Sequence, residues 1–242
     1  MRARAFLILL LLASGAEAQE RIQVAVSSNF VLTFTEIAMA FEESTGILAL
    51  ARSGSTGQLY AQISNGAPFD VYIAADDERP AALEHSGYGV KGTRFTYALG
   101  RLVVWSRKAD DCLAVLHDPS AGYIALANPD LAPYGAAARD FLVSIGAWHA
   151  ERIVLGMNAM QARSFAVTGN AVAAVMPYAQ LTGLARTNSR CVYEVPADAH
   201  RPIRQQAILL DEKNVSAQRF LAYLKSDEAR EIIRQYGYEV PE

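Results

Sequence analysis

Two short polar segments of this chain have the composition of anion-binding turns. They are Val26-Ser27-Ser28-Asn29-Phe30 and Ser53-Gly54-Ser55-Thr56-Gly57-Gln58, and each follows an apolar, strand-like run and precedes a helix-like one. At a strand-to-helix junction, hydroxyl and amide side chains lie beside unpaired backbone N–H groups and the positive end of the helix dipole. Two such turns in one region predict one shared anion.

An ordinary structural role competes with this interpretation for each turn taken alone. Ser28 or Asn29, and Ser55 or Thr56, could serve only as helix N-caps, which contribute about 1 kcal/mol each. The order of elements favours binding, because strand, polar turn and helix occur twice before a further strand at 69–74. That arrangement places ligands at the carboxyl ends of parallel strands.

Hydrophobic periodicity predicts an α/β chain in two parts, each with a mainly parallel sheet and flanking helices. In the first part we expect strands at 22–26, 47–51 and 69–74, and helices from 30 to Gly46, at 56–64 and after Asp76 or Asp77. A β-rich segment at 93–105 crosses to the second part. There we expect strands at 123–127, 153–155 and 171–176, and helices at 134–145, 161–168 and 178–185. Segments 192–195 and 202–210 should carry the chain back, and helices at 216–225 and 226–236 close it.

An ordered set of motifs in these segments resembles the periplasmic molybdate-binding proteins of ABC importers. The resemblance runs from Gln23 to Tyr238 through Val26-Ser27-Ser28-Asn29-Phe30, Gly54-Ser55-Thr56-Gly57, Tyr60-Ala61-Gln62-Ile63, Gly66-Ala67-Pro68, Ala74-Ala75-Asp76, Arg94-Phe95-Thr96-Tyr97-Ala98, Leu102-Val103-Val104-Trp105-Ser106 and Ala132-Pro133-Tyr134-Gly135. It implies a two-lobed receptor of the type II periplasmic binding protein fold, with lobe I at 19–98 plus 203–242, lobe II at 99–202, and hinges near 97–101 and 195–204. It also implies capture of molybdate, and of tungstate, between the lobes for delivery to a membrane permease.

The resemblance assigns five positions to the oxyanion. Ser28 and Asn29 match the first-turn donors, and Thr56 matches a second-turn hydroxyl that is usually serine in those receptors. Tyr134 matches a donor from the second lobe, and Ala159 matches a backbone N–H donor. Tyr134 could instead only pack at the cleft mouth, and the loop at Ala159 could only connect two elements. We expect no cofactor and no direct ligand to a metal ion.

Three further residues bear on that assignment. Some of the receptors have a pocket tyrosine where this chain has Pro177, which has no N–H to donate. The pocket is therefore expected to depend on Tyr134, or else to differ from both forms. Arg52 and Arg163 lie near the proposed turns, and we expect them to point to solvent or to rim the cleft.

The ends and the composition limit the function classes. Residues 1–18 have the order of a signal peptide, with Arg2 and Arg4, an apolar run, and Ala16-Glu17-Ala18 at the cleavage site. We therefore expect a periplasmic, monomeric protein whose mature chain does not insert into the membrane. A formal net charge of −3 without basic clusters argues against nucleic-acid binding.

The cysteines and histidines allow fewer conclusions. Cys112 and Cys191 are compatible with one disulfide in an exported protein, and also with two small buried residues. The four histidines lack the spacing of a metal site.

Two other functions stay open at this point. The same fold could bind sulfate, ferric ion or a small organic anion, although ferric receptors use clustered tyrosines and carboxylates. A secreted hydrolase could use Ser28 or Ser55 as its nucleophile, but no histidine base lies near either residue in the sequence. We therefore expect a binding protein rather than an enzyme.

Overall fold

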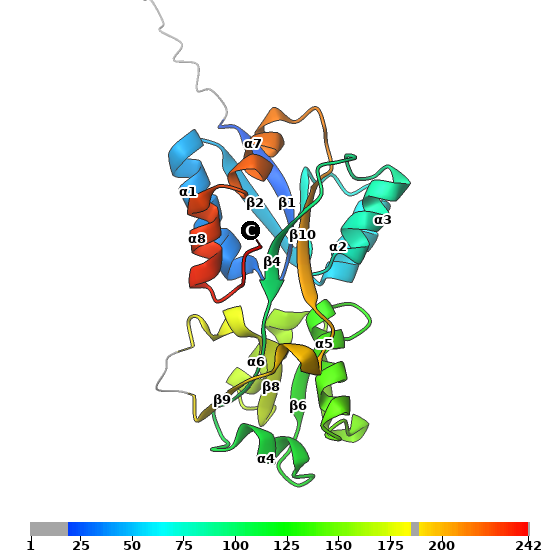
Figure 1. Cartoon of the computed structure of the whole chain (residues 1–242), viewed down its shortest axis with the longest axis vertical. Coiled ribbons are helices and arrows are strands. Elements are labelled where there is room, and N and C mark those ends of the chain that lie inside the picture. Colours follow the sequence, from blue (N-terminus) through cyan, green and yellow to red (C-terminus); the bar gives the residue numbers. More distant parts are fainter. Residues whose placement is uncertain (1–18, 185–188, 242) are drawn as a thin grey trace, which may run out of the picture.

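The computed structural model describes residues 19–184 and 189–241, which form two α/β lobes stacked along the long axis of the molecule (Figure 1). The first lobe contains a sheet in the order β2 (Leu48–Gly54), β1 (Arg21–Ser27), β3 (Val71–Ile73), β10 (Ile203–Leu209) and β4 (Phe95–Gly100). The second contains a sheet in the order β7 (Ile153–Gly156), β6 (Ile124–Ala127), β8 (Ala173–Pro177), β5 (Leu102–Ser106) and β9 (Cys191–Glu194). The central strands of both sheets are parallel, as predicted, whereas β10 and β5 run antiparallel to their neighbours.

Helices cover both sheets. Those of the first lobe are α1 (Val31–Thr45), α2 (Thr56–Ser64), α3 (Glu78–Ser86), α7 (Val215–Tyr223) and α8 (Asp227–Gln235). Those of the second lobe are α4 (Cys112–His117), α5 (Pro133–Ser144), α6 (Ala159–Val167) and the short 3-10 helices η1 (Ala150–Arg152), η2 (Tyr178–Leu181) and η4 (Ala197–Ala199).

The apolar pattern of each element decides which face it buries. On α1, the side chains of Phe34, Ile37 and Phe41 recur at steps of three and four and pack into the core of the first lobe. On β1, Val24 faces that core while its neighbour Ala25 faces the opposite layer with α2 and α3. The polar turns at the strand ends are therefore held on a packed scaffold.

Two crossing segments join the lobes (Figure 1). The chain passes from β4 to β5 at Arg101, and it returns from β9 through η4 to β10. Near the end of the chain, Glu239 forms a β-bridge with Leu99 of β4, next to the first crossing. The lobes are thus connected through short segments at the ends of strands.

Several elements differ from the prediction. The expected helix at 178–185 is only η2, because Thr182 and Gly183 leave the helical path, and position 185 lies outside the described residues. Helix α4 was not predicted, although Asp111 caps it by accepting hydrogen bonds from Leu113 and Ala114. Strand β9 does not carry the chain back to the first lobe, since it pairs with β5 in the second sheet. The expected signal peptide at 1–18 also lies outside the described residues.

A disulfide closes the second lobe. Cys112 at the start of α4 is bonded to Cys191 at the start of β9, with a Cα–Cα distance of 5.6 Å and a sequence separation of 79 residues. Of the two interpretations left open by the sequence, the structure has the disulfide. It links the start of α4 covalently to β9, the edge strand of the second sheet.

Loss of this disulfide should destabilise the protein without altering its cleft. We expect the Cys112→Ala/Cys191→Ala variant to lose about 2–4 kcal/mol of unfolding free energy, because a long loop is no longer closed in the unfolded chain. Urea unfolding of the variant, beside the wild type with and without reductant, measures the change. An unfolding free energy equal to that of the oxidised wild type would contradict a stabilising role.

Candidate anion-binding site

The first polar turn connects β1 to α1 and is fixed by backbone hydrogen bonds. Ser28 N donates to Gly54 O at 2.9 Å, and Phe30 N donates to Ser27 O at 2.9 Å. Ser28 and Asn29 are each 4% exposed. The turn is thus rigid and buried, and the Ser28 hydroxyl has a set position.

The second polar turn places a threonine hydroxyl beside the first. Ser55 and Gln58 form a capping box at the start of α2, which occupies the Ser55 oxygen with the Gln58 N–H. Thr56 Oγ1 lies 2.8 Å from Ser27 Oγ and accepts a hydrogen bond from Ala75 N at 3.3 Å. Of the two roles considered for this turn, helix capping belongs to Ser55, whereas Thr56 faces the first turn and is the candidate for binding.

The second lobe contributes the starts of α5 and α6. Gly135 lets α5 approach β6, because a Cβ at that position would lie only 2.1 Å from Ala127 O. Pro133 occupies the first helical position, where its missing N–H costs nothing, and Tyr134 follows it. Asn158 caps α6 by accepting from Gln161 N at 3.0 Å, so α6 begins at Ala159, two residues earlier than predicted.

A small cavity between the lobes brings all five predicted residues together. Its walls consist of Ser27, Ser28, Asn29, Ser55, Thr56, Ala75, Ala132, Pro133, Tyr134 and Ala159. The starts of α1, α2, α5 and α6 all meet at it. The prediction omitted Ser27, whose position at the end of β1 was its only signal.

The cavity is polar but carries no charged side chain among the described residues that line it. Within the described residues, the backbone N–H groups of Asn29, Thr56 and Tyr134 find no protein acceptor. Four helix N-termini and unpaired N–H donors create a positive potential without a cation. The site therefore favours an anion held by neutral donors.

The nearby arginines lie outside the cavity. Arg52 is exposed on the edge strand β2. Arg163 donates to Gln180 O at 3.0 Å, and its partial burial lowers the pKa of its guanidinium. Pro177 ends β8 opposite Leu102 and is not among the lining residues.

A buried polar network lies behind the cavity. The Asn29 side-chain amide donates to Gln205 Oε1 at 2.6 Å, and the Tyr134 hydroxyl accepts from Gln205 Nε2 at 3.3 Å. Burial raises the pKa of Tyr134 well above its ordinary value, and it does the same for Tyr97. These hydroxyls therefore stay neutral near physiological pH, and Asn29 and Tyr134 leave their backbone N–H groups for the cavity.

Direct contacts hold the two lobes together around the cavity. Ala159 N of the second lobe donates to Ser28 Oγ of the first at 3.1 Å. Gly57 N of the first lobe donates to Leu131 O of the second at 2.8 Å. The structure is thus in a closed form, in which both lobes contribute walls to one site.

No group of three or more His, Cys, Asp or Glu side chains that could hold a metal ion occurs in residues 19–184 and 189–241. No helix within these ranges is long and apolar enough to cross a bilayer.

Two α/β lobes on crossing strands, with a donor-lined cavity between them, define a solute-binding protein. The family model described as bacterial extracellular solute-binding protein matches residues 22–239. The chain belongs to that family.

Named relatives cover nearly the whole chain. The molybdate-binding protein ModA of Azotobacter vinelandii is 43% identical over 94% of this chain and 93% of its own length. The protein of the same name from Rhodobacter capsulatus is 40% identical over 98% of this chain and 94% of its own.

Solved structures agree on the architecture. The Azotobacter vinelandii periplasmic molybdate-binding protein has a TM-score of 0.86 and 35% identity, covering 91% of this chain and all of that one. The sulfate-binding protein SubI of Mycobacterium tuberculosis has a TM-score of 0.73 at 13% identity, covering 91% of this chain and 87% of that one, and it shares the fold alone.

The position of Tyr134 depends on a glycine at the hinge. A Cβ at Gly100 would lie 2.2 Å from the Tyr134 hydroxyl oxygen and 2.8 Å from its Cζ. We expect Gly100→Ala to lower the unfolding free energy by about 1–3 kcal/mol, because the ring must move. In a Tyr134→Phe background the loss should be smaller, since the nearest atom is gone. Urea unfolding of the four proteins measures the difference, and equal losses would show that the two residues do not compete for space.

Proposed function

We propose that this protein captures molybdate, and tungstate, between its two lobes and delivers the anion to the membrane permease of an ABC transporter. The observation that carries the proposal is the closed, uncharged cavity at which four helix N-termini meet. The names of the two relatives that cover nearly the whole chain support the choice of ligand.

The donors suit a tetrahedral dianion. Ser28, Asn29 and Thr56 would hold it from the first lobe through hydroxyl and N–H groups, and Tyr134 would hold it from the second. The Ala159 N–H would join them by exchanging its contact with Ser28 Oγ for the anion. Hydrogen bonds to a charged group are about twice as strong as neutral ones, so several of them replace the lost hydration. Helix dipoles spread the charge without a counterion.

Binding couples to closure because the donors are divided between the lobes. An anion on the first lobe alone lacks the donors at the starts of α5 and α6. It binds the closed form better and therefore shifts the population toward it. Closure then presents the permease with a surface that differs from that of the empty receptor.

The same features argue against catalysis and against a ferric ligand. No histidine lies among the described residues that line the cavity, so Ser28 and Ser55 have no base there. The lining carries no carboxylate, and its one tyrosine hydroxyl bonds to Gln205. We therefore infer a binding protein that needs no cofactor.

The setting of this function follows from the family. An extracellular solute-binding protein fits export through the signal peptide at 1–18 and action in the periplasm. We infer a monomer, because the site is complete within one chain.

Selectivity among oxyanions tests the ligand. We expect molybdate and tungstate to bind about equally, sulfate far more weakly, and phosphate weakest. Monohydrogen phosphate carries an O–H that finds no carboxylate acceptor in the cavity, at a cost of about 1–3 kcal/mol. Sulfate has no such proton and is rejected only by its smaller size. Calorimetric titration of ligand-stripped protein measures the ranking, and displacement of molybdate by comparable sulfate or phosphate would overturn the proposal.

Single hydroxyl deletions test the site. Ser28→Ala and Thr56→Val should each weaken molybdate binding roughly 10- to 150-fold, because each removes a hydrogen bond to a charged group. Ser44→Ala and Thr35→Val are matched controls, since both residues are exposed on α1 and their hydroxyls bond only to carbonyls of their own helix. Calorimetry should find wild-type affinity in both controls. Wild-type affinity in Ser28→Ala and Thr56→Val would place the site elsewhere.

A further inference from the structure

We propose that Gln205 is a positioning residue that couples anion binding to closure of the lobes. The inference rests on the function proposed above and concerns how the same site is regulated. Gln205 does not line the cavity. It acts through two residues that do, Asn29 of the first lobe and Tyr134 of the second.

The location of Gln205 follows from an irregularity in the sheet. On β10, Gln205 pairs with Ala98 and the next residue, Gln206, pairs with Thr96, so Tyr97 is an extra residue on β4. Such a β-bulge redirects side chains next to functional sites. Here it lies in the first lobe close to the crossing at Ile203, and it brings the Tyr97 hydroxyl to 3.2 Å from Gln205 Oε1.

The Gln205 amide uses its two ends toward different lobes. Its Oε1 accepts a hydrogen bond from Asn29 Nδ2 at 2.6 Å. The Tyr97 hydroxyl, whose single proton is shared with Ala74 O at 3.1 Å, lies 3.2 Å from the same oxygen, so the oxygen end of the amide faces donors of the first lobe. Its Nε2 donates to the Tyr134 hydroxyl of the second lobe at 3.3 Å. Gln205 is completely buried, so each of these partners lacks water as a substitute.

This geometry joins ligand binding to the hinge. The backbone N–H groups of Asn29 and Tyr134 are donors for the anion, and the side chains of the same two residues meet at one amide. Opening the lobes moves Tyr134 away from Gln205 and leaves a buried donor unpaired. Gln205 thus stabilises the closed form and orients donors from both lobes toward one another.

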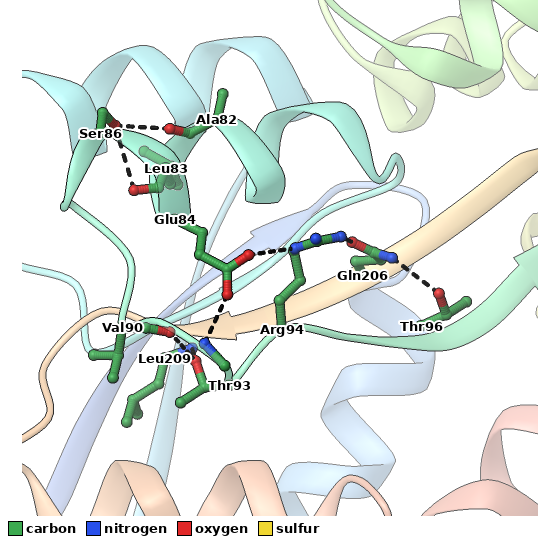
Figure 2. A network of polar contacts seen from close by, with 11 residues as sticks. Ala82, Leu83, Glu84, Ser86, Val90, Thr93, Arg94, Thr96, Gln206 and Leu209 are labelled. Carbon is green, nitrogen blue, oxygen red and sulfur yellow. Dashed lines mark hydrogen bonds and ion pairs between the residues drawn. The ribbon is translucent and has the colours of Figure 1, made fainter.

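Gln206 offers a matched control one residue further along β10. It is also buried and makes two side-chain hydrogen bonds, accepting from Arg94 Nη1 at 2.7 Å and donating to Thr96 Oγ1 at 3.0 Å. Figure 2 shows these bonds together with the Arg94–Glu84 ion pair. All partners in this network belong to the first lobe, so its loss disturbs the fold but not the contact between lobes.

The experiment compares Gln205→Leu with Gln206→Leu in the full mature protein. We expect both to unfold at lower urea concentrations, but only Gln205→Leu to bind molybdate about tenfold more weakly, as expected for one lost buried hydrogen bond. The loss should appear mainly as faster molybdate release in stopped-flow experiments. Small-angle scattering should show a smaller decrease in radius of gyration on adding molybdate than in the wild type or Gln206→Leu.

A second variant covers the case in which Gln205→Leu does not fold. Tyr134→Phe leaves Gln205 and its contact with Asn29 in place, keeps the Tyr134 backbone N–H, and removes only the hydroxyl that accepts from Gln205 Nε2. It should show the same faster release of molybdate.

The outcomes separate the two proposals. Equal affinities and release rates in the Gln205 and Gln206 variants, with a wild type that binds molybdate, would overturn the coupling role alone. A wild type that does not bind molybdate would overturn the proposed function, and the coupling role with it.

Discussion

An anion that is buried between two lobes loses its hydration, and the site must replace it with donors that are already oriented. Here the donors are fixed by the starts of helices, where backbone N–H groups have no partner within the helix. Ser55 and Asn158 cap α2 and α6 with their own side chains. The adjacent Thr56 and Ala159 are thereby held at the cavity wall. The remaining architecture serves to bring these helix starts to one point.

A charge-neutral site also suits a receptor that must release its ligand. In the proposed site each lobe contributes only part of the donor set, so an anion there would be held tightly only while the lobes are closed. An arginine or lysine within the cavity would hold the anion on one lobe regardless of closure. The buried tyrosines behind the cavity stay uncharged because burial raises the pKa of their hydroxyls. They can therefore hydrogen-bond without opposing the anion.

The packing around the cavity is as specific as its lining. Gly135 allows α5 to approach the end of β6, and Gly100 leaves room for the Tyr134 ring at the hinge. Neither glycine has a positive φ, so close approach and not backbone freedom explains both. The fold is shared with receptors of other ligands, and such local choices of small residues and donors separate one receptor from another.

The sequence by itself determined what depends on neighbours along the chain. Periodic apolar residues predicted α1, the strand order at each lobe's start and most helix ends, because period and capping are local properties. Ser28, Asn29 and Thr56 lie in polar strand-to-helix turns that a local pattern marks, whereas Tyr134 and Ala159 were assigned only through resemblance to a known family; all five line one cavity. Only the tertiary structure decided what depends on register between distant strands. The bulge that brings Gln205 to Asn29 and Tyr134, the place of β9 in the second sheet and the Cys112–Cys191 bond all join segments far apart in sequence. Their pairing follows from how distant segments assemble within each lobe's sheet, which no local pattern encodes.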